Sequence, residues 1–345
     1  MNEENRYKRT TAIPLWKKTL FSLIPLAVLL FSAELYFRIY PAYKPIVGKT
    51  RTGYVIPDKT LIWKLNPNLT GYRAPNTEGF RDNPYNPDAE FKILLLGDSI
   101  SWGDCVPHTE KIYPQVCEIT LSKETGKSFE IINTAVPGYS TLQELRALKL
   151  YSRKYKPQMV ILQFCLNDVV DRFRTIAAYG GDSVFLGVDT RAACRGFAKL
   201  AEYSRLVETI VRYKQRQGRN WEEYQVKNIV KTPLSKEIKY AWKLVFKELL
   251  EMKKVSDKSG TDFLILVTPF KFQLNADDSQ LLPQKMLRAF AEQNDIDFID
   301  LLPAFRKNKD KKLFADADHF SVEGHKVAAA VLEEYLKEKF AQKLK

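Results

Sequence analysis

Two distant segments of the chain carry the residue types of a serine hydrolase. Ser99 ends Gly97-Asp98-Ser99, directly after the apolar run Ile93–Leu96, and His319 follows Asp316 by three residues. A serine hydroxyl becomes a good nucleophile only when a neighbouring base removes its proton. An imidazole can do this near neutral pH, and a carboxylate on its other nitrogen fixes the tautomer. We therefore predict Ser99 as nucleophile, His319 as base and Asp316 as its orienting partner.

The choice of base is narrow because the chain has only three histidines, His108, His319 and His325. His325 follows Gly324 at the start of a helical pattern and has no aspartate at the right spacing upstream. His108 lies in a polar loop soon after Ser99, where a surface position is the simpler interpretation. His319 is the preferred base.

The tripeptide alone is weak evidence, because it occurs a second time as Gly181-Asp182-Ser183. Ala177-Ala178-Tyr179-Gly180 precedes this copy in place of an aliphatic run. We expect a loop turn there, with no role for Ser183 as a nucleophile.

Acyl transfer also needs hydrogen-bond donors for the oxyanion that forms in the transition state. An apolar strand pattern ends at Pro137, and Gly138 follows it. Because glycine has no Cβ, the N–H of Gly138 can closely approach a substrate. Asn167 follows the strand pattern Met159–Phe164, so its amide is expected at the same sheet edge. Alone, Gly138 also suits a turn and Asn167 a helix cap. Their place after strands, where open parallel sheets bind ligands, favours an oxyanion hole.

The segments around Ser99, Gly138, Asn167 and His319 resemble the sequence blocks of the SGNH (GDSL-type) hydrolase superfamily, from roughly Phe91 to the C-terminus. The resemblance implies that Ser99 is the nucleophile and also the first oxyanion donor through its own N–H. Gly138 and Asn167 would complete the oxyanion hole, and His319 with Asp316 would complete the catalytic set.

Two further segments bear on this resemblance. Cys165 stands where the third block of the family usually has glycine, which questions the turn before Asn167. Gly79-Phe80-Arg81-Asp82 is similar to a feature of many membrane-anchored bacterial relatives.

The fold expected is α/β, with a five-stranded parallel sheet covered by helices on both faces, because strand and helix patterns alternate. The chain order, with Ser99 after the first strand of this sheet and His319 far behind it, fits a flavodoxin-like three-layer sandwich. The Gly-x-Ser-x-Gly elbow of α/β-hydrolases is absent from the sequence. The expected strands are Lys92–Gly97, Glu130–Ala135, Met159–Phe164, Phe263–Thr268 and Asp297–Leu301. The expected helices are Lys111–Thr125, Leu142–Lys154, Lys236–Lys258, Pro283–Gln293 and Val322–Phe340.

The N-terminus carries a second strong pattern, an uncharged apolar run from Leu20 to Ala33 behind a basic segment. We interpret residues 1–18 as a cytoplasmic basic tail and 19–40 as a transmembrane helix that anchors the chain in the bilayer. The catalytic domain would then lie outside the cytoplasm. A cleaved signal peptide is the main alternative, and a buried soluble helix is a weaker one.

The remainder divides into three parts. Residues 41–90 are an ordered arm or a linker, and residues 91–345 form the hydrolase domain. Residues 169–233 interrupt its pattern, with a helical piece near 197–216. An insert of this length that directly follows Asn167 is expected to overhang the site and to select substrates.

Other ligands are not indicated. Scattered histidines and four cysteines without Cys-x-x-Cys spacing predict no metal site and no cofactor, and we predict no disulfide. The net charge of +13 suits an anionic membrane or an acidic polymer, and would equally arise in a lysine-rich proteome. No nucleic-acid-binding motif is present, so nucleic acid is not an expected partner.

The leading functional hypothesis is a membrane-anchored serine esterase that hydrolyses an acyl ester through Ser99. Relatives act on acetylated sugars, lipids and thioesters, so the resemblance implies ester chemistry, with an envelope glycan or a lipid as the candidate substrate. An O-acyltransferase to a polysaccharide is the alternative with the same residues. A non-catalytic binding protein is the third hypothesis, and retention of all four named residues argues against it.

Overall fold

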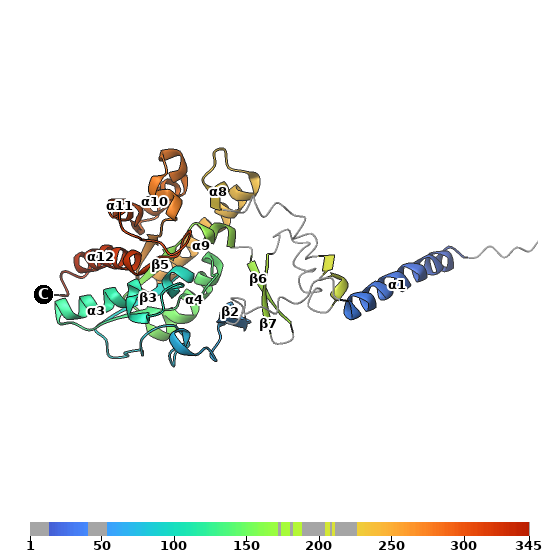
Figure 1. Ribbon diagram of the computed structural model, residues 1–345, viewed down its shortest axis with the longest axis horizontal. Helices are drawn as coiled ribbons and strands as arrows, with labels where there is room; N and C mark the ends of the chain where they lie inside the picture. The colour runs from blue at the N-terminus through green and yellow to red at the C-terminus, as the bar shows by residue number, and fades with distance from the viewer. Residues whose placement is uncertain are drawn as a thin grey trace, which may run out of the picture. The chain divides into compact units, whose positions relative to one another are not determined.

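The computed structural model describes residues 14–40, 54–171, 174–179, 182–187, 204–207, 209–210 and 226–344. The chain forms two compact units. The first comprises Met1–Gly48 and Thr190–Gly218, and the second comprises Lys49–Asp189 and Arg219–Lys345. Figure 1 labels the elements in chain order.

A five-stranded parallel sheet organises the second unit, with strand order β4-β3-β5-β8-β9. This order is typical of the flavodoxin-like fold that the sequence predicts, and the five predicted strands are confirmed with bounds that differ by at most two residues. The strands are β3 (Phe91–Leu96), β4 (Phe129–Asn133), β5 (Met159–Phe164), β8 (Asp262–Val267) and β9 (Asp297–Asp300).

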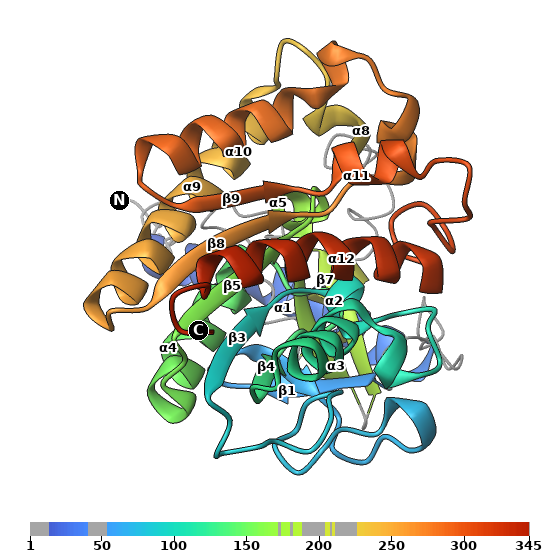
Figure 2. The ribbon, with the colours of Figure 1, turned by 90° about the vertical axis from the view of Figure 1, so that its left-hand side faces the viewer.

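Helices cover both faces of this sheet. α3 packs against α12, and α4 packs against α9; Figure 2 shows α3 and α12 on the near side of the sheet. The long helices are α3 (Tyr113–Thr125), α4 (Thr141–Tyr155), α9 (Lys236–Lys258), α10 (Leu282–Gln293) and α12 (Val322–Lys339). The short helices are α2 (Ser99–Trp102), α5 (Asn167–Asp171), α8 (Val226–Ile229) and α11 (Leu302–Lys307).

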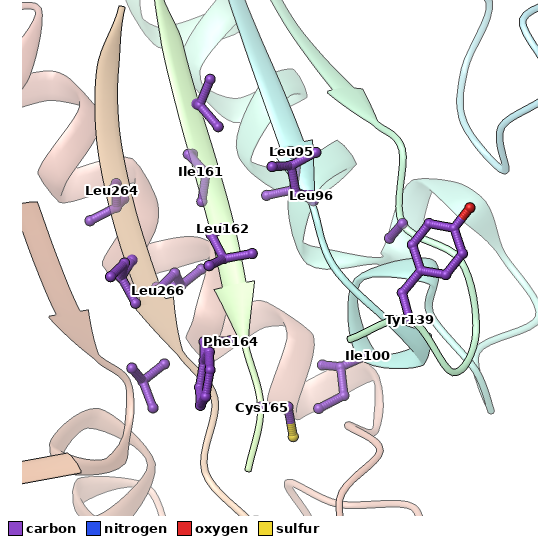
Figure 3. Packing of buried hydrophobic residues seen from close by; sticks show 14 of the residues in the cluster. Leu95, Leu96, Ile100, Tyr139, Ile161, Leu162, Phe164, Cys165, Leu264 and Leu266 are labelled. Carbon is purple, nitrogen blue, oxygen red and sulfur yellow. The ribbon is translucent and has the colours of Figure 1, made fainter. Parts of the chain in front are cut away.

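The core lies on the central strands, which are aliphatic because a parallel sheet is buried on both faces. Leu95, Ile161 and Leu264 from three adjacent strands are fully buried (Figure 3). Burying each such side chain contributes roughly 1.5–3 kcal/mol. Ile100 and Cys165 lie where β3 and β5 end (Figure 3), so the edge that carries the polar motifs rests directly on this core.

The segment before the sheet is part of the same core. β1 (Val55–Asp58) and β2 (Ile62–Leu65) form an antiparallel hairpin, and Trp63 within it is completely buried. Trp63 Nε1 donates to the carbonyl oxygen of Pro137 at 3.2 Å, and the hydroxyl of Tyr139 donates to the carbonyl oxygen of Trp63 at 2.7 Å. The hairpin thus clamps the turn that contains Gly138. Residues 41–53 of the predicted arm lie outside the described residues.

The predicted insert contains a second hairpin, formed by β6 (Arg174–Tyr179) and β7 (Asp182–Gly187). The expectation of a loop at the second Gly-Asp-Ser copy is therefore wrong for Asp182 and Ser183, which begin β7 opposite Tyr179 and Ala178. Antiparallel pairing with β6 forms this strand, although no aliphatic run precedes it in the sequence. Most of the helical piece predicted near 197–216 lies outside the described residues.

The first unit contains α1 (Leu15–Ile39), which begins four residues before the predicted span. Its apolar side chains are largely exposed, and it is long and apolar enough to cross a membrane, a property shared by membrane anchors and signal sequences. Near its end, Glu34 accepts hydrogen bonds from Arg38 Nε at 2.8 Å and from Ser204 Oγ at 2.7 Å. Of the predicted basic tail, residues 1–18, residues 1–13 lie outside the described residues.

Candidate active site

The structure brings together the side chains of Ser99, His319 and Asp316, which the sequence predicts as nucleophile, base and orienting partner. His319 Nε2 lies 2.9 Å from Ser99 Oγ, and His319 Nδ1 lies 2.7 Å from Asp316 Oδ2. The other carboxylate oxygen of Asp316 accepts the backbone N–H of His319 at 2.9 Å. Asp316 therefore holds both the ring and the backbone of His319, and the spacing of three residues is what a tight turn requires.

The turn that presents Ser99 depends on a close approach at Gly97. A Cβ on Gly97 would come within 2.6 Å of Gln163 Oε1, which accepts the N–H of Asp98 at 3.1 Å. Asp98 caps α2, because its Oδ1 accepts the N–H of Ile100 at 2.9 Å. Ser99 is thus the first residue of a short helix at the carboxyl end of β3.

Gly138 and Asn167 lie on the two neighbouring segments at the same sheet edge. Gly138 has a φ of +79°, a left-handed conformation that favours glycine. Asn167 begins α5, and its side-chain Nδ2 donates to Asp98 Oδ2 at 2.9 Å. Asp98 therefore orients the serine turn and the Asn167 amide together.

Cys165 does not disturb the turn before Asn167. Asp168 Oδ2 accepts the N–H of Cys165 at 2.9 Å, and the carbonyl oxygen of Cys165 accepts the N–H of Asp168 at 3.0 Å. Asp98 and Asp168 therefore hold, through their side chains, the turns that follow β3 and β5. Burial raises the pKa of the Cys165 thiol well above its usual value, so this thiol stays protonated.

The other histidines have different surroundings. His325 is fully buried in α12, where Nδ1 accepts the backbone N–H of Tyr113 at 3.2 Å. Burial lowers its pKa to about 3, so it is neutral at physiological pH. His108 is exposed, with Nδ1 3.5 Å from Glu110.

Negative charge surrounds His319. Burial lowers the pKa of His319, but the charges of Asp318, Asp316 and Asp104 outweigh burial and raise it above 6.5. Burial raises the pKa of Asp316, yet its hydrogen bonds to His319 and Asp318 outweigh this and lower it to about 2. An ionised carboxylate thus faces an imidazole that gains a proton readily, as a general base requires.

Sequence patterns missed three residues beside this site. Asp104 Oδ2 lies 3.9 Å from His319 Nε2, and Cys105 offers a sulfur atom within 4.8 Å of ligand atoms of Asp316 and His319. Arg81 is buried and donates to the carbonyl oxygens of Gly103 at 2.7 Å and of Val106, which bracket that loop. These residues come from segments far apart in the sequence, and no spacing pattern indicates that they meet. Arg81 was noted only as part of Gly79-Phe80-Arg81-Asp82, without a role at this site.

A family model described as GDSL-like lipase/acylhydrolase matches residues 95–327. The chain belongs to this family. A GDSL hydrolase acts on ester bonds, so the chain is an ester hydrolase with ester substrates. A search of curated protein sequences finds no match.

Several solved structures are similar to this GDSL hydrolase at low sequence identity. TesA has 14% identity and a TM-score of 0.45, with 72% of this chain and 98% of TesA covered. The psychrotrophic esterase EstA from Pseudoalteromonas sp. has 11% identity and a TM-score of 0.44, with 73% and 100% covered. A catalytic mutant of Axe2, an acetylxylan esterase from Geobacillus stearothermophilus, has 16% identity and a TM-score of 0.44, with 71% and 93% covered. The family assignment rests on the family model.

Proposed function

We propose that this GDSL hydrolase is a membrane-anchored serine esterase in which Ser99, His319 and Asp316 form the catalytic triad. The continuous hydrogen-bonded path from Ser99 Oγ through the imidazole to Asp316 is the observation that carries the proposal. Asp316 accepts from Nδ1–H, so the Nε2 lone pair faces the serine hydroxyl and can accept its proton.

The reaction follows from this arrangement. Ser99 Oγ attacks the ester carbonyl while His319 Nε2 takes the hydroxyl proton, and the tetrahedral intermediate collapses as His319 returns the proton to the leaving alcohol. Water then attacks the acyl-enzyme by the same route and releases the acid. His319 is a base in the first half of each step and an acid in the second.

The oxyanion hole in this proposal consists of the backbone N–H groups of Ser99 and Gly138 and the side-chain amide of Asn167. The left-handed turn at Gly138 and the Asp98–Asn167 hydrogen bond support it. An amide nitrogen carries two hydrogens, so donation to Asp98 is compatible with donation to an oxyanion. Removing one such donor typically costs ~100–1,000-fold in kcat.

The proposal places residues 19–40 in the bilayer and the catalytic domain outside the cytoplasm. Its support is the exposed apolar helix α1 and the excess of positive charge before it, which orients a single span with its N-terminus in the cytoplasm. In this proposal the substrate is an acyl ester of an envelope glycan or lipid, which the anchor would keep within reach. Protease added to spheroplasts should remove the catalytic domain, and protection of that domain would contradict this orientation.

The test of the triad uses the full-length protein in detergent. The wild-type protein should react with a fluorophosphonate probe and hydrolyse an aryl acetate, and Ser99→Ala and His319→Ala should each lower kcat by at least about 1,000-fold. Ser183→Ala is the matched control, because it alters the serine of the second Gly-Asp-Ser copy and should keep wild-type labelling. Undiminished hydrolysis by Ser99→Ala would refute the proposal.

The same assay separates hydrolysis from acyl transfer. An oligosaccharide acceptor should leave the rate of acid release unchanged if water is the natural acceptor. Acylated sugar formed at the expense of free acid would instead identify an O-acyltransferase that uses the same three residues.

A further inference from the structure

A cysteine, a histidine and an aspartate converge at the mouth of the site described above. Cys105 Sγ, a ring nitrogen of His319 and a carboxylate oxygen of Asp316 all lie within 4.8 Å of one another. Cys105 and Asp316 are exposed, whereas His319 is buried. These three groups are ligands of Zn²⁺ and similar ions, which bind thiolate, imidazole and carboxylate at about 2.0–2.3 Å.

The loop that carries Cys105 is held in a fixed conformation. Cys105 has a φ of +70°, which is unfavourable for a residue with a Cβ. The N–H of Asp104 donates to the carbonyl oxygen of Ser99 at 2.9 Å, and the N–H of Cys105 donates to Asp104 Oδ1 at 3.1 Å. Arg81 binds the carbonyl oxygens of Gly103 and Val106 on either side. The thiol is therefore presented at a defined position next to the imidazole.

The charge around this cluster favours a cation. Asp104 Oδ2 lies 3.9 Å from His319 Nε2, and Asp318 Oδ1 lies 3.6 Å from His319 Nδ1. Neither is needed as a ligand, but both add negative potential at the point where the three ligand atoms meet. A thiolate with an imidazole selects zinc-like ions over Ca²⁺ or Mg²⁺, which prefer oxygen ligands.

We propose that Cys105, His319 and Asp316 bind a thiophilic divalent cation such as Zn²⁺, and that its binding switches the esterase off. The inhibitory half of this inference rests on the proposed function. A cation on Nε2 occupies the lone pair that would accept the Ser99 proton. A cation on Nδ1 confines the ring hydrogen to Nε2, which then cannot accept that proton either. In both arrangements His319 stops acting as a base.

The binding half is tested without any activity. Full-length untagged Ser99→Ala protein, which keeps all three ligands, is titrated with Cd²⁺, and the near-ultraviolet absorption of a cadmium–thiolate bond is recorded. The band should appear at one equivalent and be lost when Cys105→Ser is added to the Ser99→Ala background. His108→Ala in the same background is the matched control, since it removes an exposed histidine beside Glu110, outside the cluster. The His108 variant should keep the band.

The inhibitory half compares each protein with itself. Zn²⁺ should inhibit aryl acetate hydrolysis by the wild-type protein, and EDTA should restore it. Cys105→Ser should need at least a tenfold higher zinc concentration for half-inhibition, while His108→Ala should behave as wild type. Equal zinc sensitivity of wild type and Cys105→Ser, or a cadmium band that survives loss of Cys105, would overturn the inference. A Cys105-dependent cadmium band in a protein without esterase activity would support the site and refute the proposed function.

Discussion

The Asp318 carboxylate lies 3.6 Å from His319 Nδ1, close enough to act on the charge of the imidazole but beyond hydrogen-bonding distance. Burial raises the pKa of Asp318 itself to about 6, and the charge of its carboxylate raises the pKa of His319. A general base must be unprotonated, and the pKa of His319 is raised. We expect kcat/KM to rise with pH along a limb whose apparent pKa lies above 6.5.

Asp318→Asn should move that limb to lower pH, because it removes the largest of the charges that raise the pKa of His319. The plateau rate at high pH should remain near the wild-type value, since Asp316 still orients the ring. The measurement is kcat/KM for an aryl acetate from pH 5 to 9. An unchanged limb, or a limb displaced to higher pH, would show that Asp318 does not govern this base.

Asp316→Asn should lower the rate itself, whereas Asp318→Asn should only shift its pH dependence, although the two aspartates are two positions apart. The hydrogen bond of 2.7 Å to Nδ1 fixes the tautomer, and an amide in that place can donate its own hydrogen and favour the wrong one. We expect kcat to fall by up to about 10⁴-fold at every pH. Single-turnover kinetics with both asparagine variants side by side checks this; equal losses in the two would contradict the distinction.

Arg81 stabilises the loop that follows Ser99 and α2. Its guanidinium is buried, donates to the carbonyl oxygens of Trp102 at 2.8 Å and Gly103 at 2.7 Å, and lies 4.9 Å from the ring centre of Trp102. A buried carbonyl left without a donor costs about 1–3 kcal/mol. Arg81→Ala should therefore lower the free energy of unfolding by roughly 3 kcal/mol or more, measured by urea denaturation.

Arg146→Ala is the matched control for this measurement, because Arg146 also donates to a backbone carbonyl, that of Thr60, but at the surface. It should change the free energy of unfolding by less than about 0.5 kcal/mol. Arg81→Lys should keep part of the stability, since an ammonium can reach fewer of the carbonyls that the planar guanidinium spans. Similar losses of stability in Arg81→Ala and Arg146→Ala would show that the buried hydrogen bonds of Arg81 do not stabilise this loop.

The strands of the sheet were predictable because each central strand is a dense aliphatic run bounded by polar turns. The runs at Ile93–Leu96 and Met159–Phe164 bury both faces, and this composition differs sharply from that of the helices between them. Hairpins β1–β2 and β6–β7 were not predicted. The strands of β1–β2 have only four residues each, and one contains Pro57, so the local sequence pattern gives little indication of a strand. Their pairing is stabilised by the distant contact between Trp63 and Tyr139.

The site was predictable where its members follow strands or stand close in sequence. Ser99, Gly138 and Asn167 each follow a strand end, and Asp316 reaches His319 within one turn. Contacts that join distant loops were not predictable. Cys105 meets Asp316 across 211 positions, and no periodicity or spacing encodes such a pair.

Glu144 gives a prediction about stability that is separate from catalysis. It is fully buried in α4, and neither carboxylate oxygen has a hydrogen-bond partner among the described residues. Burial, with smaller effects of the Asp98 and Glu248 charges, raises its pKa well above 4.5. The folded state therefore retains a proton on Glu144 that the unfolded state loses, and the contribution of Glu144 to the free energy of unfolding should fall as pH rises above 4.5.

Glu144→Gln has no proton to lose, so its free energy of unfolding should exceed that of the wild type by a margin that grows between pH 5 and 8. The growth is at most about 1.4 kcal/mol per pH unit, which is the limit for one proton. Urea denaturation at three pH values measures the margin, with Glu110→Gln as an exposed control that should show none. If the difference in free energy of unfolding between the two proteins does not change with pH, Glu144 ionises in the folded protein much as it does in the unfolded chain. Its carboxylate oxygens would then have to gain a hydrogen-bond partner when the proton leaves.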